Sequence, residues 1–166
     1  VNDITMTIGM GHLQKGHAIS FADFDNDGDQ DVFQQMGGAK KVDKFRDALY
    51  ANPGFNNNWI KIRLEGVQSN RSAIGAKIKI TLDQGNQHIY RSINTGGSFG
   101  ANSLQQHIGI GSITIIDELE IFWPTSNTTQ TFRNLRSNQS IQIREGEKSY
   151  KTTNEPLFSY DVYLEN

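Results

Sequence analysis

The sequence contains no cysteine, which excludes disulfide bonds, thiolate metal sites and a cysteine nucleophile. It has no apolar run near the roughly 18 residues of a membrane-spanning helix, so we expect no membrane span. It also has no basic cluster, and its net charge of −2 argues against nucleic acid as a partner. No signal peptide is visible, and the start at Val1 indicates a fragment without its targeting elements.

Hydrophobic residues make up only 36% of the 166 residues. Glycine, asparagine and glutamine replace them, rather than charge, which is typical of a loop-rich all-β protein and not of a disordered one. The length suits one domain, or a small domain with an appendage, and is sufficient for a core.

The most informative stretch is an acidic loop at residues 23–31, with five aspartates in nine residues. These charges repel one another unless a cation lies among them. The spacing predicts a calcium site, since calcium takes about six to eight oxygen ligands. We expect Gly28 to permit a sharp turn, Asp29 to offer its backbone carbonyl while its side chain faces solvent, and the other aspartates to bind through side chains: Asp23, Asp25, Asp27 and Asp31.

The same spacing opens an EF-hand, but two features exclude that motif. An EF-hand has a bidentate glutamate at position 12 of its loop, where this chain has Gln34. The flanks, residues 17–22 and 32–36, have the composition of strands and not of helices. The loop is therefore expected to join two strands.

Residues 21–31, Phe-Ala-Asp-Phe-Asp-Asn-Asp-Gly-Asp-Gln-Asp, resemble the calcium loop of an FG-GAP/VCBS repeat, the blade unit of integrin-type β-propellers. A propeller needs at least four blades, and the chain has one such loop. The resemblance therefore implies either the end of a longer repeat array or a lone repeat that clamps calcium.

From Trp59 onward, apolar and polar residues alternate with the period of half-buried strands. The pattern predicts antiparallel strands near residues 59–65, 74–82, 88–93, 106–110, 115–123, 129–132 and 140–144, with a hairpin turn at 83–86. Short strands at regular spacing predict an antiparallel β-sandwich or jelly-roll-like module. Residues 158–164 also alternate and are a candidate edge strand.

This second part resembles the ASPIC/UnbV domain through several ordered motifs: Asn58-Trp59-Ile60, residues 69–76, Gly96-Gly97-Ser98-Phe99, residues 107–111 and residues 119–124. In that family the domain follows FG-GAP/VCBS repeats at the C-terminal end of secreted, cartilage-acidic-protein-like proteins. The resemblance implies a calcium-binding repeat at 1–52, an ASPIC/UnbV-like β domain at 53–147 and a C-terminal extension at 148–166. It implies little about activity.

Other candidate chemistry is weaker. The glycine-rich loop at 95–103 lacks the phosphate-binding pattern, and Ser98 is not in a nucleophile elbow. His12 and His17 lie near the acidic loop in sequence, but imidazole prefers softer metals than calcium. Glu118 and Glu120 share one strand face, which is expected to be solvated.

Arg71 and Trp123 are the remaining candidates for ligand binding, because an aromatic platform beside an arginine can hold a sugar or a peptide.

Two functions remain open. The first is a non-catalytic, calcium-stabilised extracellular binding or adhesion module, whose ligand is a glycan or a protein. The alternative is a non-catalytic or accessory fragment of a larger secreted carbohydrate-acting enzyme. Neither hypothesis assigns a catalytic residue to this chain, and Ca²⁺ is the one cofactor expected.

Overall fold

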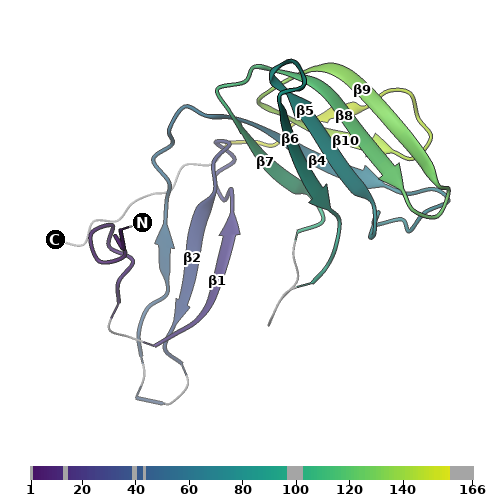
Figure 1. Cartoon of the computed structure of the whole chain (residues 1–166). Helices are drawn as coiled ribbons and strands as arrows, with labels where there is room; N and C mark the ends of the chain where they lie inside the picture. Colours follow the sequence, from purple (N-terminus) through teal and green to yellow (C-terminus); the bar gives the residue numbers. More distant parts are fainter. Residues whose placement is uncertain (1, 13–14, 39–40, 43, 97–102, 158–166) are drawn as a thin grey trace. The chain divides into compact units, whose positions relative to one another are not determined.

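The computed structural model describes residues 2–12, 15–38, 41–42, 44–96 and 103–157. These residues form strands, turns and one 3₁₀ turn, with no α-helix among them, so the expected all-β class is confirmed (Figure 1). The chain divides into two compact units between Pro53 and Gly54. Within the described ranges, no helix is long and apolar enough to cross a membrane.

The first unit is a three-stranded antiparallel sheet in the order β1-β2-β3. Its strands are β1 (Gly16–Ala22), β2 (Asp31–Met36) and β3 (Ala48–Tyr50). The acidic loop joins β1 to β2, and Ala22 at the end of β1 pairs with Asp31 at the start of β2. The prediction that strands, not helices, flank this loop is therefore confirmed.

The first unit buries few apolar side chains. Met36 is the one hydrophobic residue of its described part that is buried, at 6% exposure. Ile19, Phe21 and Leu49 lie on its strands with 59%, 64% and 42% of their surface exposed. A three-stranded sheet normally gains its stability by burying a hydrophobic face, and this one leaves large apolar side chains uncovered.

The described part of the segment before β1 contains turns and no strand. Residues 5–9 form these turns, in which the Ile8 N–H donates to the Ile4 carbonyl at 3.0 Å and the Met10 N–H to the Thr5 carbonyl at 3.1 Å. Gly9 has φ +78°, in the left-handed region, which is incompatible with a continuous strand.

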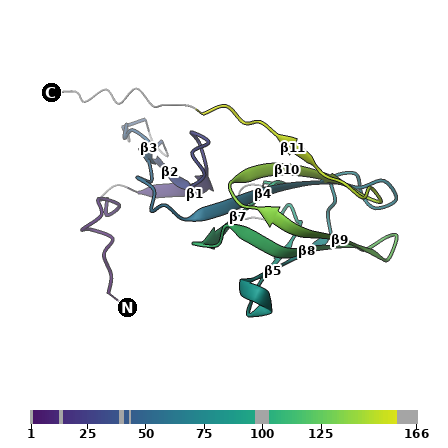
Figure 2. The same cartoon turned by 90° about the horizontal axis from the view of Figure 1, so that it is seen from above.

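The second unit is a β-sandwich of two four-stranded sheets, seen from a second direction in Figure 2. The first sheet has the order β11-β10-β4-β7 and consists of β4 (Asn58–Glu65), β7 (Gln106–Gly111), β10 (Gln139–Arg144) and β11 (Lys151–Thr153). The second has the order β6-β5-β8-β9 and consists of β5 (Lys77–Leu82), β6 (Gln87–Ser92), β8 (Ile115–Trp123) and β9 (Thr128–Arg136).

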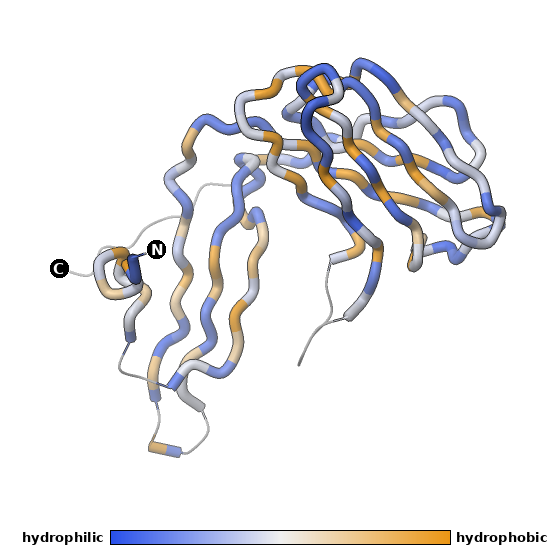
Figure 3. Tube along the Cα trace, viewed as in Figure 1, coloured by the Kyte–Doolittle hydropathy of each residue, from blue (hydrophilic) through white to orange (hydrophobic). Residues whose placement is uncertain are grey.

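Alternating isoleucines and leucines build the core between these sheets, as the period of two predicts. The hydropathy colouring of Figure 3 shows this alternation along the sandwich strands. Ile60 and Ile62 of β4 and Ile80 of β5 are completely buried, in one core with Ile108 and Ile143. Burial of this kind contributes about 1.5–3 kcal/mol for each large apolar side chain.

One pairing departs from the predicted antiparallel arrangement. β4 and β10 pair in parallel, with Arg63 opposite Gln142 and Glu65 opposite Arg144. The two strands are far apart in sequence, and the chain passes through both sheets between them. Alternation determines which face of a strand is buried, but it does not determine the direction of a distant partner.

The strand expected at 74–82 begins at Lys77. Ala73 and Gly75 both have positive φ, at 57° and 93°, so Ile74 belongs to the preceding turn and is 40% exposed. The hairpin turn at 83–86 is confirmed, as a 3₁₀ turn (Asp83–Gly85) between β5 and β6. The candidate edge strand at 158–164 lies outside the described residues.

Candidate functional site

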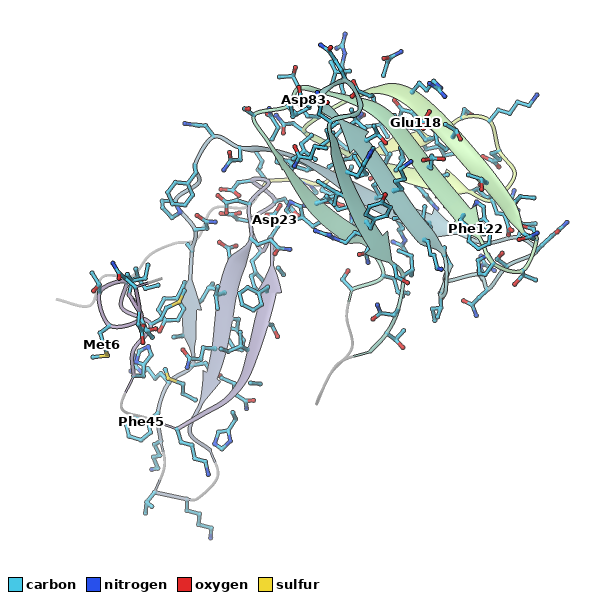
Figure 4. All side chains as sticks on the ribbon, viewed as in Figure 1. Met6, Asp23, Phe45, Asp83, Glu118 and Phe122 are labelled. Carbon is cyan, nitrogen blue, oxygen red and sulfur yellow. The ribbon has the colours of Figure 1, made fainter. Side chains whose placement is uncertain are left out.

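The acidic loop brings three of its carboxylates together. Carboxylate oxygens of Asp23, Asp25 and Asp27 all lie within 4.8 Å of one another. Figure 4 labels Asp23 at the start of the loop that joins β1 and β2. Gly28 has φ +103°, a conformation that suits glycine and not an L side chain, so its predicted role at the turn is confirmed.

The loop is shaped by its own aspartates, which accept hydrogen bonds from the backbone. The Gly28 N–H donates to Asp23 Oδ2 at 3.0 Å. The Asp29 N–H donates to Asp27 Oδ1 at 3.0 Å, and the Asp27 N–H to Asp25 Oδ1 at 3.2 Å. The backbone thus curls so that alternate side chains point to the same side.

Asp31 has a different environment. It is 1% exposed, and its two carboxylate oxygens accept from the Phe24 N–H at 3.0 Å and the Asn52 N–H at 2.8 Å. It therefore fastens the acidic loop to the segment after β3, and it is not in the group formed by Asp23, Asp25 and Asp27. Its place as a fourth side-chain ligand stays a prediction.

Asp29 corrects one detail of the sequence-based expectation, because its side chain does not simply face solvent. Its Oδ1 is buried and has no hydrogen-bond partner in the described part of the chain. Burial, followed by the negative charges of Asp27, Asp31, Asp25 and Asp23, raises the pKa of Asp29 to about 6. A partly buried carboxylate without a donor is costly, and a cation beside it would remove that cost.

The donor set suits a hard cation. All of the candidate metal ligands in the group are carboxylate oxygens, which calcium and magnesium prefer, and no nitrogen or sulfur atom is among them. His12 contacts the Tyr50 hydroxyl through its Nε2, and His17 is exposed on β1. Neither histidine belongs to the group of aspartates.

The aromatic platform proposed at Trp123 is wrong. Trp123 is completely buried in the sandwich core, and its indole N–H donates to Gln130 Oε1. Leu119, Ile121 and Trp123 all face the core because they alternate along β8. A ring with no exposed surface cannot stack on a sugar or a peptide.

Arg71, by contrast, is exposed on the turn that follows β4. This turn is held by short backbone contacts: the Gly66 N–H donates to the Arg71 carbonyl at 3.1 Å, and the Ala73 N–H donates to the Asn70 carbonyl at 2.7 Å. A Cβ on Gly66 would lie 2.2 Å from the Asn70 carbonyl oxygen, so the turn accepts only glycine there.

One buried carboxylate that the sequence did not reveal anchors this turn. Glu145, 7% exposed, accepts from the backbone N–H groups of Val67, Gln68 and Ser69 through Oε2, at 2.6, 2.8 and 2.8 Å. Its Oε1 accepts from the hydroxyls of Ser69 and Ser126 at 2.9 and 2.6 Å. Burial raises the pKa of this group, but the hydrogen bonds outweigh burial and hold the pKa at about 2.

A pocket of about 320 Å³ opens beside the turn. It lies at the end of β4, next to β10, where Arg63 pairs with Gln142. The remaining lining residues come from the end of β4, from the turn and from the segment before β7: Leu64, Glu65, Arg71, Ser72 and Leu104.

The other acidic pair is structural. Glu120 forms an ion pair with Lys79 at 2.7 Å, and Glu118 pairs with Arg133 at 2.5 Å, both across neighbouring strands of the second sheet. This agrees with the expected solvated face. Most of the glycine-rich loop, including Ser98, lies outside the described residues.

Residues 66–150 match the model of the family described as ASPIC and UnbV, which is just over half of the chain. The matched segment begins at the Gly66 turn and includes Arg71, Trp123 and Glu145, whereas the acidic loop precedes it. No curated protein matches the sequence.

Proposed function

The chain belongs to the ASPIC and UnbV family, and from this we propose that it is a non-catalytic, calcium-stabilised extracellular module that binds a glycan or a protein. The observation that carries the calcium part is the convergence of the Asp23, Asp25 and Asp27 carboxylates within 4.8 Å. The buried, unpartnered Oδ1 of Asp29 supports it independently.

In this proposal Asp23, Asp25 and Asp27 hold the ion, and Asp29 and Asp31 complete its surroundings. Calcium supplies positive charge there and ties the end of β1 to the start of β2. The role is structural, because a loop that gives most of its oxygens to an ion leaves little room for a substrate. Extracellular calcium modules work at about 10⁻⁴–10⁻³ M calcium, so occupancy is expected outside the cell.

The first unit is further proposed to be an FG-GAP/VCBS repeat. Two properties support this assignment: a hairpin closed by the acidic loop, and the large exposed fractions of Ile19, Phe21 and Leu49. Ile19 and Phe21 lie on one face of the sheet and Leu49 on the other. A repeat packs against its neighbours, so an adjoining repeat on each face would cover these side chains.

The proposal of a secreted binding module competes with an accessory role in a carbohydrate-acting enzyme. Binding of a glycan or protein by the chain alone supports the module. Binding only of the polysaccharide substrate of an attached hydrolytic domain supports the accessory role, and hydrolysis by this chain's own residues contradicts both.

The calcium site is tested by titration calorimetry and by differential scanning calorimetry of the full chain with calcium and with chelator. Both tryptophans, Trp59 and Trp123, lie in the second unit, so tryptophan fluorescence would not report the unfolding of the first unit. At calcium about 100 times its dissociation constant we expect about 2.7 kcal/mol of added stability in the first unit. Asp25→Asn should remove most of this gain.

Asp83→Asn is the matched control. Asp83 is an exposed aspartate in the β5–β6 hairpin turn, outside the acidic loop. It should leave the calcium response unchanged. Absence of calcium heat in the wild type, together with equal midpoints in calcium and chelator, would refute the site.

A further inference from the structure

The pocket at the end of β4 carries unneutralised positive charge. Arg63 and Arg71 both line it, and neither guanidinium has a hydrogen bond or ion pair within the described part of the chain. Glu65, also in the lining, is engaged already: Gln142 Nε2 donates to its Oε2 at 3.2 Å, and Arg144 Nε lies 3.7 Å from its Oε1. The pocket therefore has two guanidinium groups and one carboxylate, which Arg144 compensates only in part because it also pairs with Glu147 at 3.3 Å.

A guanidinium presents a planar fork of donors that matches a carboxylate, a sulfate or a phosphate. Glu65 limits the choice among these anions. An ionised carboxylate only accepts hydrogen bonds, so its ligand must donate, and its negative charge disfavours a doubly charged phosphate. A ligand with one carboxylate and several hydroxyls satisfies both conditions.

The rest of the lining fits the same chemistry. Ser72 and Gln142 carry groups that both donate and accept, as sugar hydroxyls do. Leu104, which is half-buried, offers an apolar surface to the C–H face of a ring. The volume is at the small end for ligand sites, which suits one sugar ring, and the described lining residues include no aromatic side chain of the kind that anchors a peptide.

We propose that the Arg63–Arg71 pocket binds a uronate residue of an acidic glycan, with the two guanidinium groups on its carboxylate and Glu65, Ser72 and Gln142 on its hydroxyls. The inference rests on the proposed binding function and gives its ligand a chemical class. Arg71 owes its position to the turn that Glu145 anchors, and Arg63 to its register against β10.

The test is titration calorimetry of the full chain with trigalacturonate in chelator, since calcium itself cross-links uronates. The fully methyl-esterified trimer keeps the hydroxyls and removes the charge. We expect binding of the acid that weakens as salt is raised, and at least about tenfold weaker binding of the ester. Arg71→Gln and Arg63→Gln should each weaken binding about tenfold, and the double variant should abolish it.

Arg91→Gln removes an exposed arginine of β6, on the opposite sheet, and should leave the affinity unchanged. Equal binding of acid and ester, wild-type affinity in the double variant, or tighter binding of a tetra-aspartate peptide than of trigalacturonate would each overturn the inference. Because these titrations contain no calcium, their failure is distinct from failure of the calcium site, which scanning calorimetry reports.

Discussion

Replacement of Glu145 by glutamine should separate the charge of this buried group from its hydrogen bonds. Glutamine has the same shape, and it can turn its carbonyl oxygen to the N–H groups of Val67, Gln68 and Ser69. Its amide NH₂ would then face the hydroxyls of Ser69 and Ser126, which can rotate to accept. The substitution therefore retains most contacts and removes the ionised oxygen that makes them strong.

The expected size of the effect follows from proton linkage. The pKa of Glu145 is about 2 in the folded chain, against 4.5 for an ordinary glutamate. A depressed pKa means that the unfolded chain binds the proton first as the pH falls. The stabilisation is therefore complete above pH 4.5 and is lost between about 4.5 and 2. At 1.36 kcal/mol for each pH unit it amounts to about 3 kcal/mol as an upper value.

Urea unfolding followed by tryptophan fluorescence at several pH values measures this directly, since buried Trp123 lies in the same unit. The wild type should exceed Glu145→Gln by up to about 3 kcal/mol near pH 7, and the difference should vanish near pH 2. Glu147→Gln is the control, because Glu147 lies two residues further on and makes an exposed ion pair with Arg144 at 3.3 Å. It should change the stability by less than about 1 kcal/mol.

The reasoning is refuted if the wild type and Glu145→Gln lose stability in parallel as the pH is lowered. A local measurement supplements the global one. Amide hydrogen exchange at Val67, Gln68 and Ser69 should accelerate in Glu145→Gln, because these three N–H groups all donate to one carboxylate oxygen.

Two further substitutions probe the second unit. Gly66→Ala places a Cβ 2.2 Å from a backbone carbonyl oxygen and should lower the free energy of unfolding in urea by about 2 kcal/mol or more. Gly109→Ala, with open space around the added Cβ, should lower it by less than about 1 kcal/mol. Equal losses in the two variants would contradict the close approach at Gly66. Glu155→Ala removes the carboxylate that lies 2.7 Å from Lys61 Nζ. The Lys61 side chain is only 5% exposed, so the loss of this partner should cost about 1–3 kcal/mol. Adding Lys61→Met should restore most of this loss, and a purely additive double-mutant cycle would argue against coupling of the pair.

The sequence predicted the strands well because alternation and turn residues are local signals. Alternation puts Ile60, Ile62 and Leu64 on one face of a strand, and all three are buried. Trp123 shares the parity of Ile121 along β8, so the same local signal places it in the core and argues against a platform. The predicted platform gave a residue type more weight than its position in the pattern.

Long-range partners were beyond this kind of reasoning. Glu145 is a single acidic residue after a strand, and nothing near it distinguishes it from Glu147. The N–H groups that define its role lie 76 to 78 residues earlier in the chain. A carboxylate bound by a distant turn has no sequence pattern of its own, because its partners are backbone groups that any residue could supply.

The arginine pocket was hidden for a related reason. Alternation puts Arg63 on the strand face opposite to Ile62, and Arg71 is a candidate in its turn, but nothing local joins the two. They line one pocket because β10 runs parallel to β4 and sets Gln142 against Arg63, while Glu145, one residue beyond β10, holds the turn that carries Arg71. The direction of β10 was the feature that alternation could not determine. The parallel direction of β10 therefore explains both why the expected antiparallel pairing was wrong and why the sequence did not indicate the pocket. A variant that loosens β10 from β4 should weaken both the hydrogen bonds that hold the turn and the binding of ligand in the pocket.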